Sequence, residues 1–350
     1  MTHLWVRAES RENEDRAGIL PGGVAALIAD GFQVTVEESP TRVVDIGEYA
    51  KAGARIATAG SWMDAPGDVI VFGLKELPDS DAPLRHRHIM FGHAYKGQPA
   101  GQRLLARFKA GGGTLYDLEY LEDVEGRRVA AFGYWAGYAG AAVSLLALAA
   151  LDDPAPCPPV RAWPSSRVMR EDVKTALNGA KPTALVIGAL GRVGTGASDL
   201  CQELGLKVTK WDMPETSHGG PFPEVLDHDV FFNCILARPG TPVFVPADAC
   251  KAPRALRVIG DIACDPDSDY SPIKVYDEVT RWAAPVIRAC QDPPLDVMAI
   301  DNLPSLLPRE SSEDFAAQLL PHLAMLDRLE SGVWGRAKTY FDTHIQKVTT

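Results

Sequence analysis

Apolar and polar residues alternate in two patterns along the first third of the chain. Short apolar runs, typical of buried strands, occur over residues 4–9, 32–38, 68–76, 88–95 and 114–121. Amphipathic segments with the periodicity of helices lie between them, over residues 22–31, 45–54 and 100–113. Strands that alternate with helices of about ten residues predict a parallel sheet covered on both faces.

A second alternating series begins near residue 181, after a stretch that holds five of the chain's 27 prolines, residues 152–166. Proline interrupts helices, so this stretch is predicted to be a surface linker. The series predicts a strand and a helix over 181–205, and further strands over 206–212, 229–236 and 255–264. The last apolar-periodic segment, 311–329, predicts a helix interrupted near Pro321 that packs back on the first domain.

One uncharged segment, residues 129–151, is long enough to span a bilayer. Nine of its residues are Ala and three are Gly, so its drive into lipid is weaker than its length suggests. Small residues also suit a helix packed tightly inside a protein, and no other segment of the sequence resembles a span. We therefore predict a buried helix and no membrane partner.

Composition narrows the classes of partner. The chain has 35 Lys and Arg against 46 Asp and Glu, a formal charge of −11, which disfavours nucleic acid as a partner. The six cysteines show no CxxC pair and no regular spacing; they are Cys157, Cys201, Cys234, Cys250, Cys264 and Cys290. A chain of 350 residues can build its cores without disulfides, so we expect free thiols in a reducing compartment.

A glycine-rich turn follows the β-branched strand at residues 183–187. Gly188, Gly191 and Gly194 are spaced as in a variant of the dinucleotide-binding fingerprint. Glycine allows the tight turn and the close approach of a pyrophosphate, and the helix opening near Arg192 directs its unpaired N–H groups at the phosphates. No Lys-Ser or Lys-Thr follows the glycines, which excludes a nucleoside-triphosphatase loop.

Asp212 strengthens this interpretation, because it lies 24 residues after Gly188 at the end of the next predicted strand. A carboxylate there accepts hydrogen bonds from the adenosine ribose and repels a 2′-phosphate, which favours NAD over NADP. The sequence thus predicts an α/β protein of two Rossmann-like domains. Residues 1–133 with 315–350 form the substrate domain and residues 134–314 the NAD-binding domain, with the active site in the cleft between them.

Polar residues follow the predicted strands of the first domain, where open parallel sheets present ligands. These residues are Arg7, Glu9, Arg16, Lys75, Glu76, His93, Lys96, Glu119, Arg127 and Arg128. His86 and His88 precede His93, but no Cys or clustered carboxylates accompany them, and a strand points His93 away from the other two. We therefore expect no metal site.

Several segments of the chain resemble one known family, in order and over almost the whole length. They are RAESRENEDRAGILP, GSWMDAPGDVIVFGLKELP, HIMFGHAYK, GTLYDLEYLEDVEGRRVAAFGYWAGYAGAA, VIGALGRVGTGA, KWDMPETSHGGPF and IDNLPSLLPRE. The family is that of the NAD-dependent, lysine-forming saccharopine dehydrogenases. The chain resembles more distantly the alanine dehydrogenase and transhydrogenase group, which shares the two-domain plan.

The resemblance implies a reversible reaction in which saccharopine, NAD and water give lysine, 2-oxoglutarate and NADH. By motif match, Lys75 corresponds to the base that takes the amine proton, and His93 to the acid–base group for imine hydrolysis. Further residues match substrate-binding or charge-balancing positions: Arg16, Glu76, Lys96, Glu119, Arg128 and Asp301. The resemblance also assigns the NAD site to Gly188, Gly191, Gly194 and Asp212, together with Arg192 at the start of the helix.

Two departures from the family pattern are visible. His218 stands where fungal members have Arg, and the C-terminus lacks their Ser-Lys-Leu ending, so we expect a cytoplasmic location. Two alternatives stay open: an opine-type dehydrogenase that joins a 2-oxo acid to a different amino acid, and an NAD-binding regulatory protein without turnover. We expect a monomer.

Overall fold

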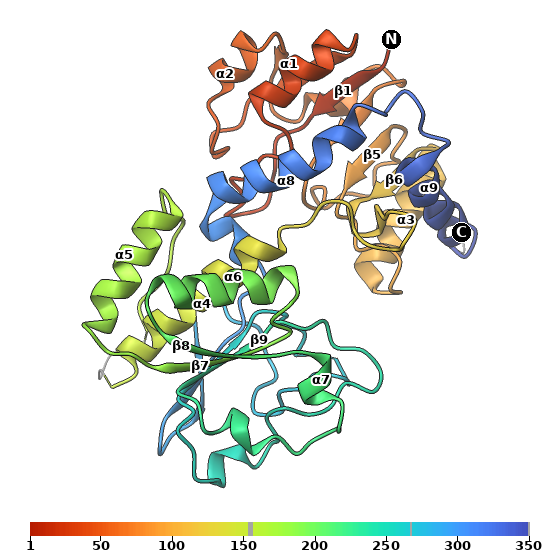
Figure 1. Ribbon diagram of the computed structural model, residues 1–350. Helices are drawn as coiled ribbons and strands as arrows, with labels where there is room; N and C mark the ends of the chain where they lie inside the picture. Colours follow the sequence, from red (N-terminus) through yellow and green to blue (C-terminus); the bar gives the residue numbers. More distant parts are fainter. Residues whose placement is uncertain (153–156, 267, 349–350) are drawn as a thin grey trace. The chain divides into compact units, whose positions relative to one another are not determined.

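The computed structural model describes residues 1–152, 157–266 and 268–348 (Figure 1). The chain divides into two compact units: unit 1 is Met1–Ala131 with Ser311–Thr350, and unit 2 is Phe132–Glu310. The boundaries predicted from the sequence are 133/134 and 314/315. Residues 153–156 of the predicted linker lie outside the described residues, and residues 157–164 contain no helix.

Unit 1 contains a six-stranded, entirely parallel sheet in the order β3-β2-β1-β4-β5-β6. Its strands are β1 (His3–Val6), β2 (Gln33–Glu37), β3 (Arg55–Ala57), β4 (Ile70–Phe72), β5 (Arg87–Met90) and β6 (Thr114–Asp117). This is the strand order of dinucleotide-binding folds, in which ligands bind beyond the carboxyl ends of the strands where the order reverses. In unit 1 that point lies between β1 and β4.

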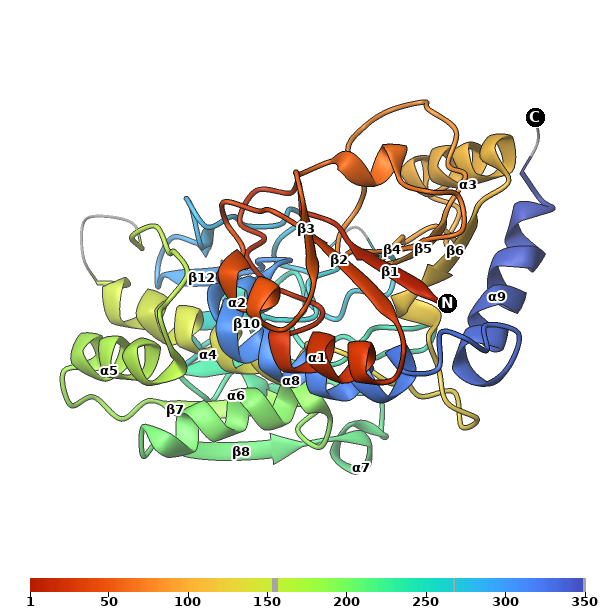
Figure 2. The same cartoon turned by 90° about the horizontal axis from the view of Figure 1, so that it is seen from above.

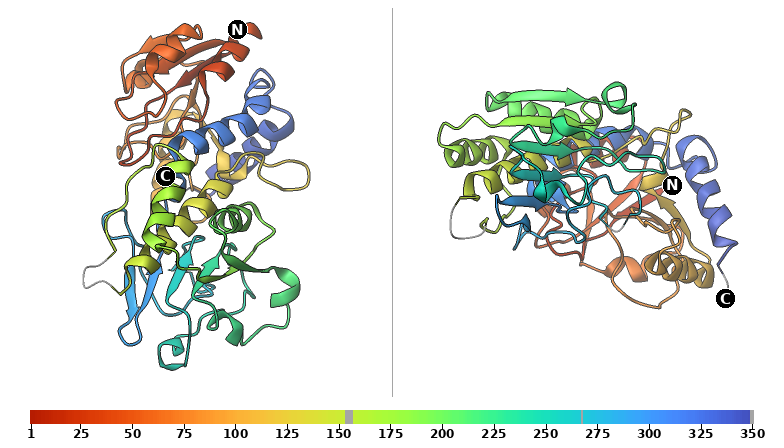
Figure 3. Two further views of the ribbon diagram at one scale, coloured as in Figure 1. Left: turned by 60° about the vertical axis from the view of Figure 1, so that its left-hand side comes forward. Right: turned by 90° about the horizontal axis from the view of Figure 1, so that it is seen from below.

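Helices cover both faces of the unit 1 sheet. They are α1 (Pro21–Ala29), α2 (Ile46–Lys51), α3 (Pro99–Gly111), α8 (Pro308–Leu323) and α9 (Gly332–Ile345). Phe108 of α3 and Phe341 of α9 join one core cluster, while Figure 2 shows α1, α2 and α8 gathered away from α3. The C-terminal segment belongs to unit 1, where α9 packs against α3 and β6 (Figure 3).

Unit 2 contains the second sheet, in the order β11-β12-β10-β9-β7-β8. Its strands are β7 (Thr183–Ile187), β8 (Lys207–Trp211), β9 (Val230–Asn233), β10 (Val258–Asp261), β11 (Ile287–Cys290) and β12 (Leu295–Met298). All pairs are parallel except β11 with β12. The order reverses between β7 and β9, at the strand that the glycine turn follows.

The two faces of the unit 2 sheet are covered differently. The helices are α4 (Gly133–Ala150), α5 (Ser166–Leu177), α6 (Arg192–Glu203) and the short α7 (Met213–Thr216). Residues of α4, α5 and α6 share a core with one face of the strands. The other face packs mainly against loops and short 3-10 turns, including η4 (Ala249–Lys251).

Helix α4 corresponds to the apolar segment singled out in the sequence. It is long and apolar enough to cross a membrane by length and composition, but 61% of it is buried inside the protein. A glycine on each helix lets the backbones of α4 and α6 touch: a Cβ at Gly137 of α4 would lie 1.8 Å from the Val193 carbonyl oxygen, and a Cβ at Gly196 of α6 would lie 1.9 Å from that of Tyr134. Gly137 and Gly196 therefore serve close helix packing.

A Gly196→Ala substitution is expected to lower the free energy of unfolding by about 1–3 kcal/mol, because the added methyl group must push α4 and α6 apart. Thermal and urea denaturation followed by circular dichroism would measure the loss. Gly22→Ala in α1 is the matched control, since nothing lies within 4 Å of a Cβ there. Equal stability of the two variants would contradict the backbone contact.

The expectation of six free thiols is wrong for two cysteines. Cys250 in η4 and Cys290 at the end of β11 form a disulfide with a Cα–Cα distance of 5.6 Å. They are 40 residues apart in sequence, and the fold of the loop-covered face brings them together, so no local spacing indicated the pair. The other four cysteines are free.

Candidate active site

Lys75 lies three residues beyond β4, at the carboxyl edge where the strand order of unit 1 reverses. Its side chain is half-buried. Burial lowers the pKa of Lys75 below its ordinary value, and the charges of Arg16 and Arg11 lower it further, against the opposite influence of Glu14 and Glu76. A lowered pKa raises the share of the neutral amine, which is the form that can accept a proton, at any given pH.

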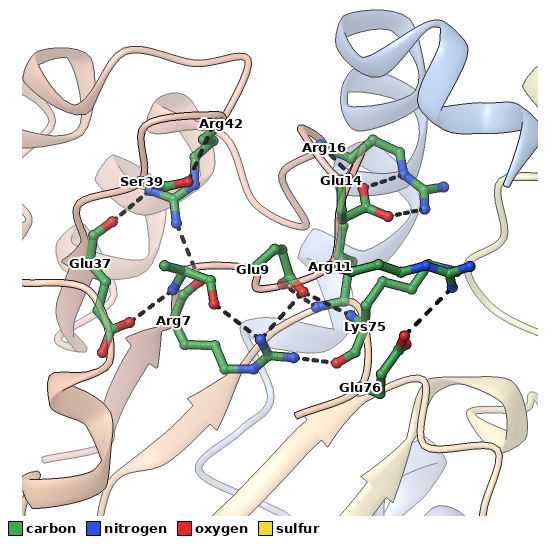
Figure 4. A network of polar contacts seen from close by, with 12 residues as sticks. Arg7, Glu9, Arg11, Glu14, Arg16, Glu37, Ser39, Arg42, Lys75 and Glu76 are labelled. Carbon is green, nitrogen blue, oxygen red and sulfur yellow. Dashed lines mark hydrogen bonds and ion pairs between the residues drawn. The ribbon is translucent and has the colours of Figure 1, made fainter. Parts of the chain in front are cut away.

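The segment that follows β1 supplies most of these neighbouring charges. Arg16 binds the buried Glu14 through two bonds, Nε to Oε1 at 2.7 Å and Nη2 to Oε2 at 2.5 Å (Figure 4). Burial alone would raise the pKa of Glu14, but the charge and hydrogen bonds of Arg16 outweigh it and hold the pKa below its ordinary value. Arg11 lies 3.7 Å from Glu76, whose side chain is exposed. The sequence analysis assigned no role to Glu14 or Arg11.

A second group of charges surrounds Glu119, in the 3-10 turn after β6 (Leu118–Tyr120). Glu119 accepts a hydrogen bond from Lys96 Nζ at 3.0 Å and lies 3.0 Å from His93 Nδ1 and 3.6 Å from Arg128 Nη2. The hydrogen bond with His93, followed by that with Lys96, lowers the pKa of Glu119 to about 2. Because the carboxylate is ionised at neutral pH, it can only accept, so His93 Nδ1 is the donor in this contact.

The backbone around this group contains one uncommon conformation, at His93, and one turn held by a buried carboxylate. His93 has a φ of +47°, a left-handed conformation uncommon for residues other than glycine. The fully buried Asp117, which the sequence analysis did not single out, accepts a hydrogen bond from the Glu119 N–H at 2.9 Å and holds the turn. Burial raises the pKa of Asp117.

In unit 2, the glycine turn leads from β7 into α6 and cannot accommodate a side chain at Gly188 or Gly194. Gly188 has a φ of +84°, and a Cβ at Gly194 would lie 2.1 Å from the Gly188 carbonyl oxygen. Gly191 is the N-cap of α6, which begins at Arg192, and a glycine offers no side chain to cap the helix. The backbone N–H groups of a helix N-terminus are suited to binding a phosphate.

Asp212 lies at the end of β8, beside the glycine turn. Its Oδ2 accepts from Leu190 N at 3.0 Å, and its Oδ1 accepts from Met213 N at 3.0 Å, at the N-terminus of α7. The bond to Leu190 joins the two elements that a dinucleotide would contact, so the glycine turn and this carboxylate together fit a pyrophosphate and a ribose. The residues of unit 2 therefore fit NAD.

The two remaining residues from the sequence analysis also lie in unit 2. Asp301 is exposed in the loop after β12, and its charge raises the pKa of the Cys264 thiol, after the larger effect of burial. His218 is exposed after α7, with its ring 4.8 Å from that of Phe222.

Two other features of unit 1, a cavity and a pair of histidines, do not include the side chains of Lys75 or His93. A cavity of about 460 Å³ lies among the loops that follow β1, β3 and β4, lined by Arg7, Glu9, Trp62 and Arg107 among others. Among the described residues, no group of three or more His, Cys, Asp or Glu is arranged to hold a metal ion. His86 and His88 lie buried beside Trp62.

Curated fungal proteins match the chain from end to end. It is 43% identical over 364 residues to saccharopine dehydrogenase (NAD(+), L-lysine-forming) of Schizosaccharomyces pombe, covering 99% of both chains. The proteins of the same name from Neurospora crassa and Candida glabrata are 44% and 45% identical, covering 100% and 97% of this chain and 97% and 96% of theirs. The chain belongs to the family of NAD-dependent, lysine-forming saccharopine dehydrogenases. The resemblance stated from the sequence is confirmed.

The wider group is confirmed as well. The family described as alanine dehydrogenase/PNT, N-terminal domain, matches residues 5–139 of this saccharopine dehydrogenase family member. An L-alanine dehydrogenase structure has a TM-score of 0.69 at 15% identity, covering 99% of both chains. A transhydrogenase from Sinorhizobium meliloti has a TM-score of 0.60 at 18% identity, covering 94% of this chain and 95% of its own. These structures show the fold: two Rossmann-like domains, as predicted.

The structure groups the predicted site residues into three sets. Lys75, Glu76 and Arg16 lie beyond β1 and β4, while His93, Lys96 and Arg128 surround the carboxylate of Glu119. The glycine turn, Arg192 and Asp212 form the third set. The role of each residue, and the placement of the active site in a cleft between the domains, stay predictions.

Proposed function

We propose that this chain catalyses the reversible, NAD-dependent conversion of saccharopine and water into lysine and 2-oxoglutarate. NAD⁺ is reduced to NADH and one proton is released, so charge and atoms balance. One observation carries the proposal: relatives of 42–45% identity over nearly the whole chain bear the name of this reaction. The residue roles below rest on the site geometry.

Lys75 is proposed to take the proton from the secondary amine of saccharopine. A secondary ammonium cannot lose hydride until its nitrogen holds a lone pair that can form the imine. The lowered pKa of Lys75, from burial and the adjacent Arg16 and Arg11, makes its neutral form available for this step. When bound, NAD supplies the hydride acceptor.

His93 is proposed to exchange protons as water adds to the imine and the carbon–nitrogen bond breaks. Its Nδ1 is fixed by Glu119, so Nε2 takes a proton from the attacking water and later returns one to the leaving lysine amine. Glu119 also holds Lys96 and Arg128, and these cations are available to attract the carboxylates of 2-oxoglutarate. Arg16 and Asp301 are proposed as further substrate contacts.

The proposed NAD site uses the residues of unit 2. Gly188, Gly191 and Gly194 give the pyrophosphate access to the N-terminus of α6, where Arg192 begins the helix. Asp212 binds the adenosine ribose, and its charge disfavours NADP.

An Asp212→Ala variant is expected to bind NADH on the order of 10–100-fold more weakly, because hydrogen bonds to a charged group contribute about 1.5–3 kcal/mol. Fluorescence titration of NADH measures this. The Michaelis constant for 2-oxoglutarate at saturating NADH is the internal control and should change much less. An unchanged NADH affinity would exclude the ribose contact.

The reaction itself is tested by following NADH oxidation at 340 nm with purified protein and 2-oxoglutarate. Lysine is the expected partner, with ornithine, arginine and alanine as controls. Turnover that requires both 2-oxoglutarate and lysine supports the proposal. Turnover with another amine would replace it by an opine-type reaction, and NADH binding with no turnover would favour a regulatory protein.

Two features remain proposals from the sequence alone. We propose a monomer in a cytoplasmic location. Light scattering after size-exclusion chromatography tests the first, and imaging of the tagged protein tests the second.

A further inference from the structure

The ends of β1 and β4 are joined by side chains where their backbone ladder stops. The parallel register runs to Val6 opposite Phe72, and one further backbone bond joins Arg7 N to the Phe72 carbonyl at 2.9 Å. Beyond that point the backbone of Leu74 and Lys75 has lost its β1 partner. Buried N–H and C=O groups must be satisfied in another way.

Glu9 supplies the missing acceptors. Its Oε1 accepts from Leu74 N at 2.7 Å, and its Oε2 accepts from Lys75 N at 3.0 Å. The side chain of Glu9 is only 8% exposed, so these two charge-assisted bonds form largely away from water. Each carboxylate oxygen thus binds one of two successive N–H groups.

Arg7 completes the arrangement from the same segment. Its Nη1 lies 3.3 Å from Glu9 Oε2, and its Nη2 donates to the Lys75 carbonyl (Figure 4). The Arg7 side chain is 1% exposed. Both backbone polar groups of Lys75 are therefore held by one buried ion pair.

Gly73 makes room for this ion pair. A Cβ at that position would lie 2.3 Å from Arg7 Nε, so a larger residue would displace the guanidinium. On the opposite side, the Leu74 carbonyl accepts from Phe91 N at 2.9 Å, at the end of β5. The peptide group between Leu74 and Lys75 is thus held from two sides, by Glu9 beyond β1 and by Phe91 beyond β5.

From these contacts we propose that Glu9, paired with Arg7, is a positioning residue that holds Lys75 in its half-buried place by binding the backbone of Lys75. This inference rests on the proposed role of Lys75 as the base. The charges that face the Lys75 side chain come from Arg11, Glu14 and Arg16 after β1 and from Glu76 beside it. Glu9 acts on the main chain, and its loss lets the lysine move towards water and away from the two arginines.

The test is the pH dependence of kcat/KM for saccharopine oxidation by a Glu9→Gln variant. Glutamine keeps the size of the side chain but replaces one acceptor oxygen with a donor. We expect kcat to fall on the order of 10–100-fold, as for an approximately 1 Å displacement of a reacting group. The rising limb of the plot of kcat/KM against pH, which reports the pKa of the base, should move to higher pH by more than about 0.5 unit, towards the ordinary pKa of lysine near 10.4.

Two further variants make the result decisive. Arg7→Lys keeps the charge opposite Glu9 but loses the fork that reaches the Lys75 carbonyl, so the same limb should move in the same direction by a smaller amount. Glu48→Gln, in the exposed first turn of α2, is the matched control and should leave the profile unchanged. Circular dichroism and NADH affinity identify any variant that has not folded.

The outcomes separate this inference from the proposed function. If Glu9→Gln and Arg7→Lys lower the rate without moving the limb, the ion pair is merely structural and the inference is overturned. If Lys75→Met leaves the wild-type limb in place, Lys75 is not the base, and the proposed role fails instead. A limb that moves in both ion-pair variants and vanishes in Lys75→Met supports both.

Discussion

A His93→Ala variant is expected to lose a factor of about 10²–10⁴ in kcat, the usual contribution of a positioned acid–base group. The structure gives the reason: His93 Nδ1 lies 3.0 Å from Glu119, whose pKa of about 2 keeps it ionised, so the imidazole has a fixed tautomer and orientation. Steady-state kinetics in both directions measures the loss. NADH affinity, which depends on unit 2, should stay nearly intact.

Added imidazole provides a control for His93→Ala, because it can occupy the vacated space and restore part of the rate. A rescue that depends on the imidazole free-base concentration would identify proton transfer as the lost function. A variant that turns over at the full rate would remove His93 from the mechanism.

A Lys75→Met variant should lose a comparable factor of about 10²–10⁴ in kcat/KM for saccharopine oxidation. Its pH profile is equally informative. The base works in its neutral form, so wild-type activity should rise as the pH rises through the Lys75 pKa. Burial, Arg16 and Arg11 place that pKa below its ordinary value. The variant should show no such rise.

Methionine is the suitable replacement for Lys75 because it keeps the apolar part of the side chain in the half-buried position and lacks only the terminal amine. Melting temperature and NADH affinity should therefore stay close to those of the wild type. A rising limb that persists at the same pH in Lys75→Met would assign the base to another group.

The sequence allowed the parallel sheets to be predicted because buried parallel strands are near-continuous apolar runs. The run at Ile70–Phe72 and the run before Gly188 are of this kind. Strand β3 (Arg55–Ala57) was missed because it has only three residues, two of them exposed and none fully buried. Strand β11 was missed for a similar reason, since only Cys290 in it is buried.

Candidate site residues were found where a titratable side chain comes soon after the end of a predicted strand. Lys75 and His93 each lie three residues beyond a buried strand, so their position at the carboxyl edge follows from a parallel sheet. Glu14 and Asp117 gave no such signal. A buried carboxylate is identified by its partners, Arg16 in one case and the Glu119 N–H in the other, and those contacts exist only after folding.

The return of the C-terminal segment to unit 1 has a consequence for synthesis on the ribosome. Residues 132–310 are contiguous, so unit 2 can complete its own sheet as soon as it has emerged. Unit 1 cannot, because Phe341 and Val348 belong to its core and Ser312 Oγ accepts from Ala17 N at 2.8 Å. The part of the chain that is made first, and that carries Lys75 and His93, is therefore the last to be finished.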